Sequence, residues 1–343
     1  MNPYALSIIL FSLASGTVIA MSSYHWLIIW VGLEINTLAM IPLMVKTPHP
    51  RAVESATKYF LTQAAASALL LFSSTMNAWL TGTWTILETS ETSTILLTTA
   101  IAIKLGIAPF HLWLPEVLQG LPILTGLILS TWQKLAPMTV FIQISPLTNL
   151  YLILVLGLTS IMIGGWNGIN QTQTRKILAY SSIAHLGWMT SSMKLYPQLS
   201  TLNFYLYILM TSTLFLALYH MNTKNMSELA NSWPKSPTLT SLTLLSLLSL
   251  SGLPPLTGFM PKWLITQEMI KHNLYILAAI MLLSTLLSLF FYLRLTYILS
   301  LTLSPNLSFS PLPWMMTKKY TYELLTVSSL LLLPLTPLIL SQL

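Results

Sequence analysis

The feature that most constrains this chain is a series of apolar runs, each long enough to cross a lipid bilayer as a helix. Crossing the hydrocarbon takes about 20 mainly apolar residues. Short polar links separate the runs and leave no room for a soluble domain. The runs predict eleven transmembrane helices, over residues 3–21, 24–45, 57–80, 94–117, 122–145, 149–169, 175–194, 200–221, 238–270, 274–299 and 323–341.

The amount of charge agrees with this interpretation. Only 7% of the 343 residues are charged and 54% are hydrophobic, whereas a soluble domain carries about 25% charged residues. The surface must therefore face lipid. The net charge of +7 does not indicate a nucleic-acid partner, because the basic residues sit singly between apolar runs and form no basic groove with interleaved aromatics.

The residue types also exclude several chemistries. The chain has no cysteine, so it has no thiolate for an iron–sulfur cluster. The stretch GGWNG at 164–168 is not a dinucleotide-binding fingerprint, and we find no P-loop or metal-ligand cluster. We therefore expect no cofactor and no metal on this chain. The start of the sequence lacks a basic segment, so we expect no cleaved targeting peptide.

Two of the predicted helices are interrupted by proline and glycine. The fourth contains GIAPFHLWLPE from Gly106, and the ninth contains SGLPPLTGFMP from Ser251. Proline removes a backbone donor, and unpaired backbone at membrane depth is tolerated only inside protein or beside a wet cavity. Interrupted helices at corresponding places in two halves of a chain are a pointer to a transport site.

The spacing of the two interruptions predicts an inverted repeat. The interrupted helices are five apart, and because five is odd the second five-helix unit must begin on the opposite side of the membrane. The sequence therefore predicts an all-α membrane protein with a single membrane domain. It comprises a first repeat over 1–147, a second over 148–300, and a surface loop with a last helix over 301–343.

Basic residues in the links predict the orientation, because cytoplasmic or matrix loops carry excess Lys and Arg. Only Lys194 and Lys271 fall on the side opposite the N-terminus. We therefore expect the N-terminus inside, in the matrix or cytoplasm, and the C-terminus outside. The basic residues on the N-terminal side are Lys46, Arg51, Lys58, Arg175, Lys176, Lys224, Lys235, Lys318 and Lys319.

Three charged residues lie deep within predicted helices. Glu34 and Lys104 are each about ten residues into a helix, or about 15 Å of rise, and Lys134 is similarly deep. A central charge costs about 2.5–3.5 kcal/mol on insertion scales. Such residues form either a structural ion pair or a proton relay. Burial destabilises a lysine ammonium and a nearby carboxylate restores it, so a glutamate that moves relative to a lysine can load and unload a proton.

Two further residues join them as candidates. Lys262 follows the second interruption. His185 lies on the same helical face as Ser181 and Ser182, and a histidine with hydroxyl neighbours can pass protons near neutral pH. A buried histidine bonded to a backbone carbonyl explains the same pattern, and the sequence leaves both interpretations open.

Three other polar residues favour structural roles. Arg294 lies near a helix end, where its side chain can extend to the interface. His111 and Glu116 sit within the first interruption, where we expect them to cap loose backbone.

Three motifs, KLGIAPFHLWLPE, RKILAYSSIAHLGWM and GLPPLTGFMPKW, resemble the antiporter-like, proton-conducting membrane subunits of complex I. They occur in the family's order, and the resemblance covers essentially the whole chain. The MNP start and the stretch WVGLEINTLAMIPL around Glu34 are most similar to animal mitochondrial members. Bacterial members carry further N-terminal helices that have no counterpart here.

The resemblance implies a non-redox subunit of the H+-translocating NADH:ubiquinone reductase in the inner mitochondrial membrane. FMN, iron–sulfur clusters and ubiquinone would belong to partner subunits. Neighbouring membrane subunits and lipids such as cardiolipin would be its partners, and it would not form a homo-oligomer. The resemblance also implies roles for single residues. Glu34 and Lys104 would form a switching pair. Lys134 would be the connecting lysine, His185 a bridge and Lys262 the terminal lysine.

Two alternatives stay open on the sequence. The first is a subunit of a multi-chain sodium/proton antiporter, which uses the same fold without redox coupling. The second is a passive scaffold. The buried charges argue against a scaffold, because leucine at those positions would be more stable.

Overall fold

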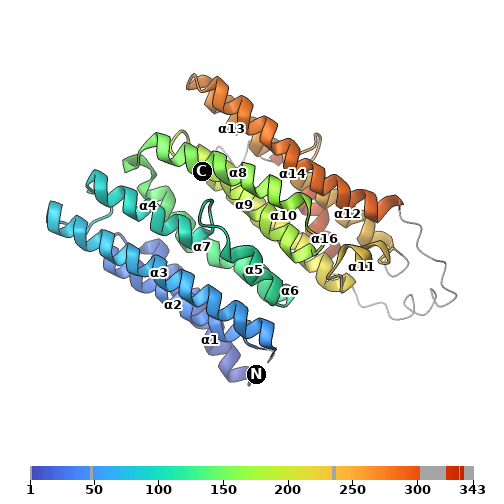
Figure 1. Cartoon of the computed structure of the whole chain (residues 1–343), viewed down its shortest axis with the longest axis horizontal. Helices are drawn as coiled ribbons and strands as arrows, with labels where there is room; N and C mark the ends of the chain where they lie inside the picture. The colour runs from blue at the N-terminus through green and yellow to red at the C-terminus, as the bar shows by residue number, and fades with distance from the viewer. Residues whose placement is uncertain (1, 47–48, 234–236, 302–321, 332, 336–343) are drawn as a thin grey trace. The chain divides into compact units, whose positions relative to one another are not determined.

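The computed structural model describes residues 2–46, 49–233, 237–301, 322–331 and 333–335. Within these ranges the chain is helical and contains no β-strand (Figure 1), which confirms the all-α class. The described chain falls into two compact units, Met1–Ser160 and Ile161–Leu343.

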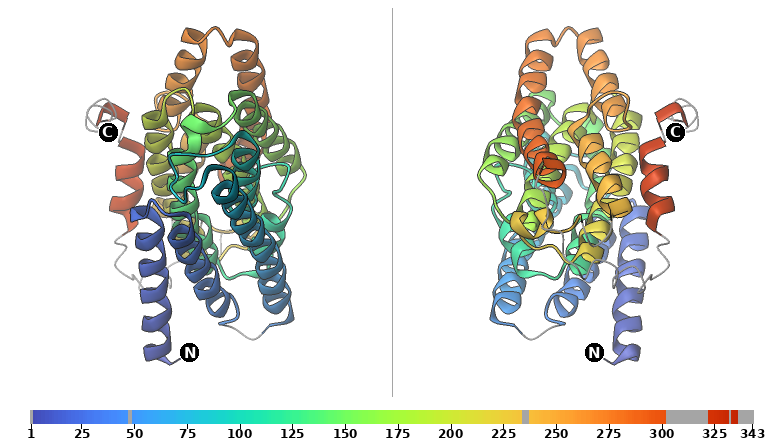
Figure 2. Two further views of the ribbon diagram at one scale, coloured as in Figure 1. Left: turned by 90° about the vertical axis from the view of Figure 1, so that its left-hand side faces the viewer. Right: turned by 90° about the vertical axis from the view of Figure 1, so that its right-hand side faces the viewer.

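The first unit contains three long helices that lie side by side, α1, α2 and α3 (Figures 1 and 2). Shorter helices follow, and α8 continues past the end of the unit. In chain order the elements are α1 Pro3–Ser22, α2 Trp26–Met44, α3 Pro50–Thr81, α4 Glu91–Leu105, α5 Trp113–Gly120, α6 Ile123–Ser130, α7 Trp132–Ile144, the 3-10 turn η1 Ser145–Leu147 and α8 Leu150–Ile169.

The second unit is built in the same way from long helices and one interrupted pair. Its elements are α9 Thr174–Ser192, α10 Pro197–Met221, α11 Met226–Ala230, α12 Pro237–Ser251, α13 Phe259–Lys271, α14 Tyr275–Leu301, α16 Tyr322–Leu331 and the 3-10 turn η2 Leu333–Leu335.

Five of the described helices, α1, α2, α8, α10 and α14, are by themselves long and apolar enough to cross a membrane. The exact number of spans stays a prediction. Much of the link around 300–322 and the end of the predicted segment 323–341 lie outside the described residues.

Both predicted interruptions are present. One separates α4 from α5 and the other separates α12 from α13. Each begins with a glycine directly after the helix: Gly106 has φ +76° and Gly252 has φ +83°. This left-handed conformation ends helices and is open to glycine because it has no Cβ. The two interruptions therefore share the same backbone beginning.

A third interruption, which the sequence did not predict, divides the segment 122–145 at Thr131, between α6 and α7. The Thr131 hydroxyl donates a 2.7 Å hydrogen bond to the Leu127 carbonyl, four residues earlier. Back-bonding of this kind competes with the helical ladder and bends helices. The bend comes three residues before Lys134.

Candidate functional site

A small polar cavity lies inside the first unit and brings together residues of α2, α3, α4 and α7. Its volume is about 20 Å³, enough for about one water molecule. Two of the predicted lysines line it. The lining residues that carry polar side-chain atoms are Asn36, Thr37, Tyr59, Gln63, Lys104, Trp113, Gln133 and Lys134.

Lys104 occupies the last turn of α4 and is 6% exposed. Its Nζ is buried and makes no hydrogen bond within the described chain. The same is true of the two polar side-chain atoms of Asn36 and of Nε2 of Gln63. A buried polar group without a partner costs about 1–3 kcal/mol. All three residues line this water-sized cavity. A water molecule in the cavity would supply the missing hydrogen bonds.

Glu34 lies half-buried on α2, and its Oε2 accepts a 2.9 Å hydrogen bond from the Thr37 hydroxyl. Its carboxylate acts electrostatically on Lys104 and on the buried Tyr59. Among the ion pairs of the described chain, none joins Glu34 to Lys104 within 4.0 Å. The carboxylate therefore interacts with Lys104 through space, without contact.

Lys134 is 3% exposed on α7 and lines the same cavity as Lys104. Beside it, Gln133 donates a 3.1 Å hydrogen bond from Nε2 to the Asn36 carbonyl, which joins α7 to α2. The first unit thus places Lys104 and Lys134 around one cavity, and Glu34 is linked to that cavity through its hydrogen bond with Thr37.

In the second unit, Lys262 reaches back across the interruption. Its Nζ donates a 2.8 Å hydrogen bond to the carbonyl of Ser251, the last residue of α12. The side chain lies over Gly252, where an added Cβ would come within 2.8 Å of the ammonium. The last carbonyls of a helix are unpaired and carry partial negative charge, so they stabilise a cation.

His185 and Lys262 line a second cavity, of about 10 Å³, between α9, α13 and α14. The ring of His185 lies 5.8 Å from the ring of Tyr207. The two serines of the predicted polar face, Ser181 and Ser182, donate to carbonyls of their own helix, those of Leu178 and Ala179. The complete lining is Ala184, His185, Trp188, Lys262, Ser288 and Tyr292.

The structure changes part of the predicted backbone capping of the first interruption. The buried His111 interacts with the backbone of Pro109 inside the interruption, in a geometry that falls short of a full hydrogen bond. Trp113 performs the expected role, because its Nε1 donates a 3.1 Å hydrogen bond to the Ile103 carbonyl. An indole N–H is a donor only and suits a carbonyl released at a helix end.

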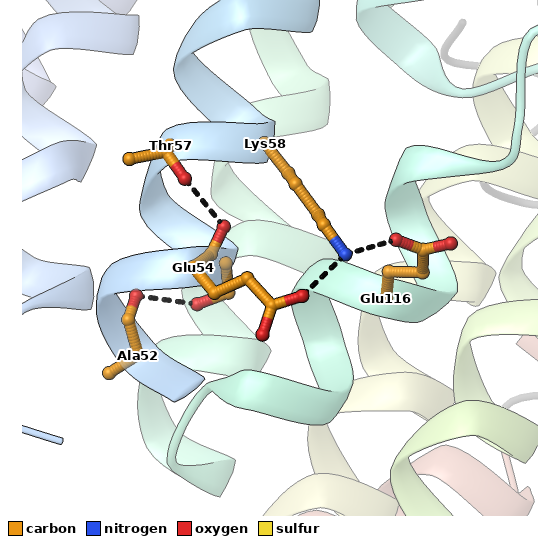
Figure 3. Close-up of polar contacts among 6 residues, drawn as sticks. Ala52, Glu54, Thr57, Lys58 and Glu116 are labelled. Atoms are coloured by element: carbon orange, nitrogen blue, oxygen red, sulfur yellow. Dashed lines mark hydrogen bonds and ion pairs between the residues drawn. The ribbon is translucent and has the colours of Figure 1, made fainter. Parts of the chain in front are cut away.

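Glu116 does not cap backbone but forms a surface ion pair (Figure 3). Lys58 of α3 lies 2.7 Å from Glu116 of α5 and 2.7 Å from Glu54 one turn earlier on its own helix. The hydrogen bond from Lys58, together with its charge, lowers the pKa of Glu54 below its usual range. The cluster connects α5 to the start of α3.

Arg294 also has a specific partner. Its Nη1 donates a 2.8 Å hydrogen bond to the carbonyl of Ile169, the last residue of α8. This contact supports the structural interpretation, since the guanidinium binds a helix C-terminus.

The sequence reasoning did not identify the neutral residues of the two cavities. The cavity of Lys104 is also lined by Thr37, Asn36, Gln63 and Gln133. The cavity of Lys262 is also lined by Tyr292. One signal was available for Thr37: it follows Glu34 by three residues and therefore shares its helical face. Gln63 and Tyr292 lie on other helices, and no spacing relates them to the lysines.

The described residues contain no group of three or more His, Cys, Asp or Glu side chains that could hold a metal ion. The groups that meet at the two cavities are amines, amides, hydroxyls and one imidazole. Such groups can bind and pass protons through hydrogen bonds.

Comparisons with known proteins give matches over nearly all of the chain. A family model described as "NADH:quinone oxidoreductase/Mrp antiporter, TM" matches residues 23–288. A second, "NADH dehydrogenase subunit 2 C-terminus", matches residues 289–340. NADH-ubiquinone oxidoreductase chain 2 of Xenopus laevis is 60% identical over 345 residues, 99% of this chain and 100% of that protein. Its counterpart in Squalus acanthias is 57% identical over 344 residues and 99% of each chain.

Solved structures give the same result for the fold. A chain in a structure of respiratory complex I from Thermus thermophilus with bound aureothin is 25% identical, with a TM-score of 0.84. The match covers 97% of this chain and 80% of that one. A chain of the Mrp complex from Dietzia sp. DQ12-45-1b is 17% identical, with a TM-score of 0.81 over 97% of this chain and 75% of that one. At this identity the likeness concerns the fold alone.

Proposed function

The chain belongs to the NADH:quinone oxidoreductase/Mrp antiporter family, within the branch of NADH-ubiquinone oxidoreductase chain 2, and on this premise we propose that it carries protons as a core membrane subunit of respiratory complex I. Its location is the inner mitochondrial membrane. Electron transfer from NADH to ubiquinone supplies the energy. The single observation that carries the proposal is Lys104, a buried lysine without a hydrogen-bond partner, beside a water-sized cavity and within electrostatic range of Glu34.

The subunit itself is non-redox, and FMN, the iron–sulfur clusters and ubiquinone belong to other subunits. The absence of cysteine from the sequence supports this division. A purified preparation of this chain alone should show no flavin or iron–sulfur absorbance. Stoichiometric cofactor in a monodisperse sample would contradict the division.

In the first unit, Glu34 and Lys104 act as the switching pair. When the carboxylate approaches, the Lys104 ammonium is stabilised and holds its proton. When the carboxylate withdraws to Thr37, the buried ammonium loses this support and gives its proton to water in the cavity. Lys134 lines the same cavity and accepts the proton as the connecting lysine.

In the second unit, His185 is the bridge and Lys262 is the terminal lysine. They line one cavity, so a single water can connect them. The hydrogen bond from Lys262 to the Ser251 carbonyl gives the ammonium a resting partner of partial charge only. Such a partner stabilises the charged lysine and still allows it to release its proton. A full carboxylate would prevent that release.

The finer architecture is part of the same proposal. It comprises eleven spans and two inverted repeats, over 1–147 and 148–300, followed by 301–343, with the N-terminus in the matrix and the C-terminus in the intermembrane space. The left-handed glycines that begin both interruptions, Gly106 and Gly252, support the repeat. Antiporter-like neighbours and lipids such as cardiolipin are its partners, and one copy is present in the complex.

Substitution of Lys104 tests the proposal. Lys104→Arg keeps the charge, but a guanidinium does not release its proton. The complex should therefore assemble and lose proton pumping per NADH oxidised. Glu34→Gln keeps the shape without the charge, so it should assemble and lose pumping as well. Assembly is measured by native gel and pumping in reconstituted vesicles.

Lys271→Arg is the matched control, because Lys271 is exposed and its ion-pair partner in the described chain is Glu268. It should pump normally. Normal pumping by the Lys104→Arg complex would exclude protonation cycling at Lys104 and favour a structural charge.

A further inference from the structure

The hydroxyl of Thr37 lies within hydrogen-bond distance of two acceptors, both on Glu34. Its Oγ1 lies 2.9 Å from the backbone carbonyl of Glu34 and 2.9 Å from Oε2 of the same residue. A hydroxyl carries one proton, so it cannot donate fully to both acceptors at once. The Thr37 hydroxyl therefore has two alternative donor states at one position.

The other helical threonines of the first unit donate mainly to backbone carbonyls. Thr17, for example, donates to the Ala14 carbonyl at 2.7 Å, which is the usual bond of a threonine within a helix. Thr37 has the carboxylate of Glu34, three residues earlier on the same face, as a second acceptor.

Thr37 also links the carboxylate to the cavity. It is 8% exposed, it bonds to Glu34, and it lines the cavity together with Lys104. Lys104 has no hydrogen-bond partner in the described chain, so a released carboxylate meets an available cation. The rotation of one hydroxyl is thus coupled to the position of the charge that acts on Lys104.

We propose that Thr37 is a positioning residue that holds Glu34 away from Lys104 while its hydroxyl donates to the carboxylate, and releases Glu34 when the hydroxyl turns to the backbone carbonyl. This inference rests on the proposed Glu34–Lys104 switch. Without the hydroxyl, Glu34 has no partner in the withdrawn state and stays paired with Lys104. The pair then keeps its proton and transport stops.

Three variants of the full complex test this role. Thr37→Val is isosteric and removes the hydroxyl, and Thr37→Ser keeps it. Thr17→Val removes a hydroxyl that is also buried and donates to a backbone carbonyl. Pumping per NADH oxidised should fall in Thr37→Val as much as in Lys104→Arg. It should stay normal in Thr37→Ser and Thr17→Val.

An infrared measurement separates positioning from folding. The carboxylate stretching band of Glu34, identified by its loss in Glu34→Gln, should shift in Thr37→Val and stay in place in Thr17→Val. Normal pumping by Thr37→Val, an unshifted band, or an equal loss in Thr17→Val would overturn the inference. If Thr37→Val does not assemble, Thr37→Ala replaces it, and failure of both assigns Thr37 a purely structural role.

The same assay separates the role of Thr37 from the proposed Glu34–Lys104 switch. If Lys104→Arg loses pumping and Thr37→Val does not, only the role of Thr37 is wrong. If Lys104→Arg pumps normally, the switch itself is wrong and the role of Thr37 is wrong with it.

Discussion

A lysine ammonium in an apolar interior needs water or a polar partner, and the two lysines of the interrupted helices meet this need differently. Lys104 faces a cavity large enough for about one water and has no protein partner in the described chain. Lys262 donates to the Ser251 carbonyl across the gap that Gly252 leaves open. Each arrangement supports a charge without fixing it beside a full countercharge.

Gly252→Ala tests the arrangement at Lys262. The new Cβ would lie within 2.8 Å of the ammonium and displace it from Ser251. A left-handed alanine also costs about 1–2 kcal/mol. We expect lower thermal stability together with reduced pumping per assembled complex, measured by thermal unfolding in detergent and by proton uptake in vesicles.

Gly82→Ala is the control for backbone strain. Gly82 has φ +75°, and nothing lies within 4 Å of an added Cβ. It should cost similar stability and leave pumping per complex unchanged. Equal pumping in the two variants would show that the contact between Gly252 and Lys262 has no role in transport.

At the scale of elements, the short helix α5 is held on α3 by two kinds of contact. One is the exposed ion-pair cluster of Lys58 with Glu54 and Glu116. The other is close backbone packing, since an added Cβ at Gly120 would lie 2.6 Å from the Arg51 carbonyl. Exposed ion pairs contribute little to stability. The closely packed backbone at Gly120, in contrast, cannot accommodate a larger side chain.

These contacts predict opposite results for two substitutions. Lys58→Met should leave assembly and pumping nearly unchanged, because water replaces the lost ion pairs. Gly120→Leu should separate α5 from α3 and prevent assembly of the subunit, as measured by native gel. Loss of assembly in Lys58→Met with normal assembly of Gly120→Leu would reverse this assignment.

For the whole molecule, the sorting of basic residues predicts the topology. Because the chain has no cysteine, an introduced cysteine is the only thiol in its band on a denaturing gel. Lys224→Cys should be labelled from the matrix side, and Lys271→Cys from the intermembrane side. Lys46→Cys is the control for matrix access, and labelling of Lys224→Cys and Lys271→Cys from the same side would contradict the eleven-span topology.

Local features of the sequence were sufficient for the helices and their two main interruptions. Apolar runs, Gly106 and Gly252 act on the backbone around them, so their effect can be predicted without knowing the neighbours. The depth of Glu34, Lys104 and Lys134 follows from counting along a helix. These features determined the membrane class and the candidate charges, and the family resemblance added the function.

The tertiary structure decided which polar atoms meet. Gln63 and Asn36 line the same cavity as Lys104. Trp113, and not His111, donates to the Ile103 carbonyl, and Glu116 pairs with Lys58. Each contact joins residues on different helices or across an interruption. It depends on the rotation and packing of those elements. No spacing along the chain specifies them, because many rotations of a helix bury a similar area of apolar surface.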